Sequence, residues 1–141
     1  MEGIQAPVAL AARLLLAYIF VVEGWNKLAG YAGTVQYMES HGVSGFLLPI
    51  VILNDLGGGV LIALGLFSRL AALALAGFCT LTALLFHADF ANPNEVIEFN
   101  KDLAIAGGFL TIVAFGAGAW SIDALPCWRG ERALHRGSWN G

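Results

Sequence analysis

The chain has 141 residues, a length typical of one domain, and hydrophobic residues make up 58% of it before its 18 glycines are counted. Soluble globular domains contain about 45–50% apolar residues with glycine included, and about a quarter charged residues where this chain has 12%. A soluble chain of this length could not bury so much apolar surface. A net charge of −3 with no basic run argues against nucleic acid as a partner. The composition therefore predicts an integral membrane protein whose main partner is the lipid bilayer.

Four apolar stretches each approach the ~20 residues that cross ~30 Å of hydrocarbon as a helix. Because lipid offers the backbone no hydrogen bonds, the stretches are predicted to be helices rather than strands. The predicted fold is an all-α, integral membrane four-helix bundle with spans at about residues 7–28, 46–67, 69–90 and 101–120. Residues 30–45 are expected to form a loop, and Asn92-Pro93 is expected to mark a turn. Residues 1–128 would form the transmembrane domain, and residues 129–141 a polar, basic cytoplasmic tail.

The basic residues predict the orientation of this bundle, since lysine and arginine concentrate in cytoplasmic loops. Four spans place both termini and the hairpin near residue 68 on one side of the membrane. That side carries Arg13, Arg69, Arg129, Arg132 and Arg136. The opposite side carries only Lys27 and Lys101, so both termini are predicted to face the cytoplasm. Arg13 and Arg69 are interpreted as boundary residues whose long side chains reach the polar surface.

Small residues indicate where the predicted helices approach one another. Helix contacts in lipid depend on close backbone packing rather than on a hydrophobic drive, and small residues allow it. The candidate positions are Gly58, Gly59, Gly65 and Gly108. They favour a compact bundle without identifying a partner.

Polar residues inside the predicted helices need an explanation, because an ionisable group at membrane depth costs at least ~2.5–3.5 kcal/mol on insertion scales. Seven lie in the half of the bundle away from the termini: Glu23, Lys27, Asn54, Asp55, His87, Lys101 and Asp102. Their charges nearly balance, which favours an internal polar pocket that binds a small ligand or relays protons. Asp55 is the strongest candidate, because its depth leaves no route to water. We expect it to contact Lys27 or Lys101 in a pocket that His87 also reaches.

Each of these residues also has a structural interpretation. Lys27 and Lys101 could extend to the membrane boundary, and His87 could be a hydrogen-bonded boundary residue. Cys79 is interpreted as a packing residue, and the absence of a CxxC pair argues against dithiol chemistry in this chain. No metal site is expected, because no HxxxH or ExxH spacing is present.

Several motifs occur together in one order. The stretch RLLLAYIFVVEGWNKL has the pattern R-x6-F-x3-G-x2-K, and DLGGGVLIALGLFSR has an acidic residue followed by x2-GG, LG and arginine. His87 follows the apolar third helix, and GAGAWSIDA has the form G-x-G-x2-S-x-D, ending at Asp123. From about residue 13 to residue 123 the chain thus resembles the DoxX family of small bacterial and archaeal membrane proteins. The family usually has Glu where this chain has Asp55, which shortens the reach of the carboxylate.

The resemblance implies a four-helix bundle in the inner membrane of a bacterial or archaeal cell. The family is named from a subunit linked to quinone-dependent sulfur oxidation. The resemblance therefore implies that this chain is a membrane component of a quinone-linked redox assembly. A quinone and other subunits of that complex would be its partners. Whether this chain catalyses a reaction itself stays open, and no motif for a covalently bound cofactor is present.

Two alternatives remain. The chain could be a non-enzymatic membrane adaptor or assembly factor whose polar network only fixes the register of the helices. It could also form a small-solute or ion pathway, although none of its predicted helices is interrupted by an internal proline as in many transporters.

Reporter fusions test the predicted orientation. Fusions at Tyr37 and Asn94 should give a periplasmic signal, and fusions after Arg129 a cytoplasmic one, because the arginines lie on the side of the termini. Alkaline phosphatase and green fluorescent protein activities measure the two sides. A periplasmic signal after Arg129 would contradict the orientation.

Overall fold

The computed structural model describes residues 2–127, which form five α-helices and two short 3-10 turns. The helices are α1 (Glu2–Ala29), α2 (Tyr31–Ser40), α3 (Leu48–Leu64), α4 (Ser68–Phe86) and α5 (Pro93–Phe115), with 3-10 turns at Gly45–Leu47 and Ile122–Ala124. The all-α prediction is confirmed, and no strand occurs in this part of the chain. The predicted basic tail at residues 129–141 lies outside the described residues.

Three of these helices are long and apolar enough to cross a membrane: α1, α4, and α3 together with the 3-10 turn before it. The 23-residue α5 is as long, but its first turns carry Glu95, Glu98, Lys101 and Asp102. The outside of the bundle exposes many large apolar side chains, among them Leu15, Leu53, Leu70 and Phe115. A soluble monomer rarely exposes such a surface, whereas lipid covers it at no cost.

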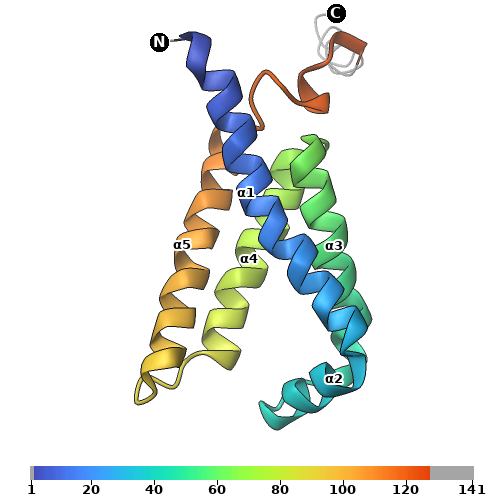
Figure 1. Ribbon diagram of the computed structural model, residues 1–141, viewed down its shortest axis with the longest axis vertical. Coiled ribbons are helices and arrows are strands. Elements are labelled where there is room, and N and C mark those ends of the chain that lie inside the picture. The colour runs from blue at the N-terminus through green and yellow to red at the C-terminus, as the bar shows by residue number, and fades with distance from the viewer. Residues whose placement is uncertain (1, 128–141) are drawn as a thin grey trace, which may run out of the picture.

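The four long helices form two closely packed pairs, α1 with α3 and α4 with α5 (Figure 1). The start of α1, the α3–α4 hairpin and the segment after α5 lie together at one end, which we call the terminal end. Where α1 crosses α5, the rings of Phe20 and Phe109 meet edge to face with centroids 5.2 Å apart. Towards the other end the two pairs diverge, and α2 lies beneath α1 and α3 (Figure 1).

Residues 30–45 differ from the predicted loop, because they contain α2. Its Met38 is buried and packs against Leu48 and Ile52 of α3. A ten-residue helix is marginal by itself, so this packing stabilises a segment whose glycines favour a loop.

The boundaries of the last two long helices also differ from the prediction. α4 ends at Phe86 rather than near residue 90, and α5 begins at Pro93 rather than residue 101. Asn92 acts as the N-cap, because its side chain accepts a hydrogen bond from the Asn94 amide at 3.1 Å, and Pro93 suits the first turn. α5 ends at Phe115 rather than residue 120, since Gly116 turns the chain with a φ of 82°.

Arg13 holds the terminal end together rather than reaching the membrane boundary. Its side chain is 2% exposed, so the interpretation as a surface-seeking residue is wrong. The guanidinium donates to the carbonyl oxygens of Ala117 at 3.0 Å, Trp120 at 2.8 Å and Ala63 at 3.5 Å. It thereby joins α1 to the end of α3 and to the segment that follows α5. Arg69, by contrast, is exposed at the start of α4.

Asp123 fastens the same segment to the α3–α4 hairpin. Its carboxylate accepts hydrogen bonds from the Phe67 amide at 3.0 Å and from the Ser68 amide and hydroxyl at 2.9 and 2.7 Å. These amides begin α4 and would otherwise lack partners within the helix. The hairpin turns at Gly65, whose φ is 69° and which lies against Arg13, so a side chain there would both strain the backbone and collide.

Paired glycine substitutions test the helix packing. A Cβ at Gly58 would lie 3.1 Å from Leu75 of α4, and one at Gly108 would lie 3.2 Å from Leu16 of α1. Gly58→Leu and Gly108→Leu should each cost about 1–3 kcal/mol through overpacking and lower the melting temperature in detergent.

The adjacent glycines supply the control for this test. A Cβ at Gly57 would meet only Leu53 of its own helix, at 3.7 Å, and one at Gly107 would meet nothing within 4 Å. Gly57→Leu and Gly107→Leu should therefore melt close to the native protein. Equal melting temperatures within each pair would contradict the packing described here.

A lysine at position 13 separates the two interpretations of Arg13. Arg13→Lys keeps the positive charge that would set topology, but an ammonium lacks the planar fork that spans three carbonyl groups. We expect it to leave the orientation of reporter fusions unchanged and to lower the free energy of unfolding by about 2 kcal/mol. A fully stable Arg13→Lys variant would show that the hydrogen bonds contribute little.

Candidate functional site

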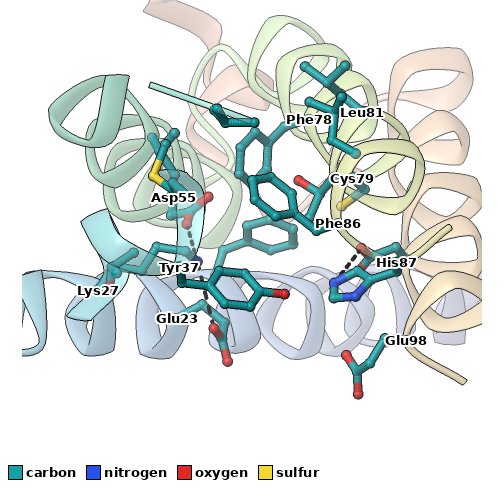
Figure 2. A pocket seen from close by; sticks show the side chains of 18 of the residues that line it. Glu23, Lys27, Tyr37, Asp55, Phe78, Cys79, Leu81, Phe86, His87 and Glu98 are labelled. Carbon is teal, nitrogen blue, oxygen red and sulfur yellow. Dashed lines mark hydrogen bonds and ion pairs between the residues drawn. The ribbon is translucent and has the colours of Figure 1, made fainter. Parts of the chain in front are cut away.

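A cavity of about 490 Å³ lies between the two helix pairs, at the end away from the termini. All five helices contribute to its wall through Phe20, Tyr37, Val51, Phe86 and Ile105 among others. The wall is mainly apolar, which differs from the polar pocket expected from the sequence, and its charged residues gather on two sides. In Figure 2, Lys27 and Asp55 lie on one side and His87 on the other, with the rings of Tyr37 and Phe86 between them.

The first charged group joins α1 to α3. The Lys27 ammonium lies 2.9 Å from Asp55 Oδ2 and 3.7 Å from Glu23 Oε2. Lys27 stands in the last turn of α1, where the helix dipole favours a cation, and Asp55 stands in the middle of α3. The predicted contact between Lys27 and Asp55 is confirmed, whereas the alternative partner Lys101 lies elsewhere.

Asp55 is the most unusual member of this group because its side chain has no exposed surface. Lys27 occupies one carboxylate oxygen, and Oδ1 has no hydrogen-bond partner among the described residues. A buried carboxylate oxygen without a donor is costly, which makes Asp55 an unusual residue for helix packing alone. Asn54, its neighbour in sequence, is half-buried and is not part of the cavity wall.

The second charged group surrounds His87 at the end of α4. Nδ1 lies 2.6 Å from Glu95 Oε2, and Nε2 lies 4.0 Å from Asp102 Oδ2, so carboxylates face both ring nitrogens. Asp102 also lines the cavity, and Lys101 forms an ion pair with Glu98 at the rim. Sequence reasoning did not identify Glu95, because α5 was expected to begin eight residues after Pro93. The sequence feature that could have revealed the earlier start of α5 is Asn92-Pro93, because an asparagine followed by a proline suits a helix start as well as a turn.

Tyr37 is a further site residue that the sequence did not reveal. It lies on α2, and its ring stacks on Phe86 with centroids 5.6 Å apart and lies at a tilt to the ring of His41 at 4.5 Å. Partial burial and the negative charges of Glu95 and Glu98 raise the pKa of the Tyr37 hydroxyl, so at neutral pH it remains protonated and can donate a hydrogen bond.

These features give the cavity a defined chemical character. Aromatic side chains offer flat apolar surfaces, the Lys27 ammonium lies on one side, and the imidazole of His87 lies on the opposite side. Cys79 lies in the wall as a free, buried thiol. The arrangement suits a small planar ligand with polar atoms at both ends of its ring.

Comparisons with known proteins place these observations in a family. The DoxX family pattern matches residues 8–88. The inner membrane protein YqjF of Escherichia coli (strain K12) is 49% identical over 125 residues, which cover 89% of this chain and 96% of the relative. The inner membrane protein YphA of the same organism is 36% identical over 130 residues, covering 86% and 92%.

A more distant similarity extends over about half of the chain. The "Putative oxidoreductase CatD" of Bacillus subtilis (strain 168) is 34% identical over 67 residues, which cover 48% of this chain and 50% of the relative. No solved structure matches the chain. The family match over residues 8–88 and the similarity to YqjF and YphA over most of the chain confirm the resemblance drawn from the motifs. The chain belongs to the DoxX family.

Proposed function

We propose that this chain is a multi-pass inner-membrane protein whose cavity binds a quinone, and that it serves as a membrane component of a redox assembly. The relatives named as inner membrane proteins and the apolar helices α1, α3 and α4 support the location. In this proposal α5 is the fourth span. The terminal end, with Arg69, faces the cytoplasm, and the cavity lies in the outer half of the bundle.

The observation that carries the ligand proposal is the buried pair of Lys27 and Asp55 facing an aromatic cavity. Apolar packing can fix the register of two helices without a buried charge, and a buried ion pair is weak evidence of a stabilising role. A ligand that uses the ammonium group gives the pair a reason to be retained.

A quinone fits these residues by its chemistry. Its ring is flat, which suits the faces of Tyr37 and Phe86, and its two oxygens stand on opposite sides of the ring, as do Lys27 and His87 in the cavity (Figure 2). When bound, a quinone would accept two electrons and two protons and become a quinol.

The protein's own residues would hold the ring and manage the protons. Asp55 and Glu23 hold the Lys27 ammonium in place. His87 links the partly exposed Glu95 to the cavity-lining Asp102, which gives a proton a route between the surface and the cavity. The other subunits of the assembly would supply the electrons, and the oxidoreductase name that CatD carries supports this redox context.

Quinone retention tests the proposal. Protein purified in a mild detergent should carry a quinone that organic extraction and mass spectrometry identify. Asp55→Asn removes the charge at nearly the same shape and should weaken binding of an added short-chain quinone tenfold or more, a loss of about 1.4 kcal/mol. Asp89→Asn, at an exposed loop position away from the cavity wall, is the matched control and should bind as the native protein does.

A double variant separates ligand binding from a purely structural role. Asp55→Leu leaves the part-buried Lys27 ammonium with only Glu23 at 3.7 Å, so this variant is expected to be less stable than the native protein. Lys27→Met combined with Asp55→Leu removes both charges and should restore folding while quinone stays absent. If this double variant folds and still retains quinone, Lys27 and Asp55 do not bind the ligand. That result would favour the alternative in which the charged residues only fix the register of the helices of a membrane adaptor.

A further inference from the structure

The cavity has two edges of opposite character. Along α1 and α5 its rim carries the charged residues Glu23, Glu98 and Lys101, whose side chains are 54%, 42% and 45% exposed. Along α3 and α4 the exposed rim residues are aliphatic: Leu47, Ile50, Leu81 and Leu85. One edge therefore suits water and the other suits lipid.

The aliphatic residues of the second edge belong to the cavity wall and to the outer surface at the same time. Ile50 in the first turn of α3 is 64% exposed, and Leu81 of α4 is 54% exposed, yet both line the cavity. Their neighbours Leu47 and Leu85 are exposed as well. A side chain that borders both the interior and the exterior marks an opening, so the cavity is open between α3 and α4.

Helix geometry explains why the opening lies there. From the residue before α3 onwards, positions 47, 50, 51 and 55 fall on one face, so the row leads from the rim inwards to Asp55. On α4 the positions 78, 81, 82 and 85 form the facing row. The two helices are joined by the hairpin at Gly65 and separate towards the other end, where these rows lie (Figure 1).

The surroundings of this opening select what can pass through it. In a bilayer, leucine and isoleucine side chains at the outer surface face acyl chains, and an ion or a hydrated solute gains nothing there. An alkyl chain can lie in the opening without leaving an apolar environment. The polar groups that recognise a head lie deeper, at Lys27 and Asp55.

We infer that the gap between α3 and α4 is a lateral portal to the bilayer, and that the ligand is a lipid-borne amphiphile. Its polar ring lies between Lys27 and His87, and its alkyl or isoprenoid chain leaves between Ile50 and Leu85 into the membrane. This inference rests on the proposed quinone site and adds the class of ligand and its route. The charged edge at Glu23, Glu98 and Lys101 carries water and protons, not the ligand.

Chain length distinguishes a portal from an enclosed cavity. Three probes share one dimethoxy-methyl-benzoquinone head and carry no chain, a decyl chain or a long isoprenoid chain. Binding is measured to the protein in lipid nanodiscs, with each affinity referred to the probe concentration in the lipid phase. With a portal, the three affinities agree within about threefold, because the chain remains in lipid throughout. In an enclosed cavity the long chains have no room, and their affinity falls tenfold or more.

Closing the portal supplies the second arm of the experiment. Ile50→Trp combined with Leu85→Trp fills the opening with large side chains and should lower the affinity for the decyl and isoprenoid probes at least tenfold. The chainless head has no chain to place in the opening, so its affinity should stay unchanged. Leu53→Trp combined with Leu84→Trp is the control, because both leucines are exposed but neither lines the cavity.

The outcomes separate the portal from the proposed function. If the chainless head binds the native protein but the longer probes do not, the ligand is water-borne, and the portal is overturned while the quinone site stands. The portal is likewise overturned if the tryptophan variant at Ile50 and Leu85 retains its native melting temperature and binds every probe normally. If no probe binds the native protein, the quinone site itself is overturned, and the portal with it. The chain-length series needs no variant, so it decides the question even where the tryptophans prevent folding.

Discussion

The ammonium group of Lys27 lies 2.9 Å from a carboxylate oxygen of Asp55, and the open end of the molecule is organised around this contact. Asp55 has no exposed surface, so a charge there without a partner would cost several kcal/mol. The pair brings the last turn of α1 onto the middle of α3. Because α1 follows α3 at this end, it diverges from α5, which it meets at Leu16 and Phe20 in the middle of the helix. The space left between the two helix pairs is the cavity.

The two ends of the bundle differ in how their polar side chains are used. At the terminal end, Asp123 accepts from amide groups at the start of α4, and Arg13 donates to carbonyl groups at the end of α3 and in the segment after α5. These hydrogen bonds draw α1, the α3–α4 hairpin and the segment after α5 together. At the other end the charged residues face a cavity and each other across it. One end is closed by these hydrogen bonds and the other encloses a cavity, and the proposed ligand site depends on this difference.

The two edges of the cavity also differ in character. Charged side chains concentrate on α1 and α5, whereas the α3–α4 edge is aliphatic. A redox-active lipid needs both surroundings at once, since its chain belongs in the bilayer and its protons come from water. The proposed site meets both needs with four helices and a short α2 that supplies Tyr37.

Several features of this protein follow from its sequence alone. The excess of apolar residues and the spacing of the apolar stretches determine an α-helical protein, because lipid permits few other structures. The depth of Asp55 predicts a contact with Lys27 or Lys101, and the structure decided for Lys27. The sequence did not determine the boundaries of α5, the existence of α2 or the role of Arg13. Asn92-Pro93 is compatible with both a turn and a helix start. The helix α2 is stabilised by the packing of Met38 against Leu48 and Ile52 of α3, which lie outside the expected loop. Only the tertiary structure decided that Arg13 donates to carbonyl groups distant in sequence, since those acceptors become available only where Gly116 ends α5.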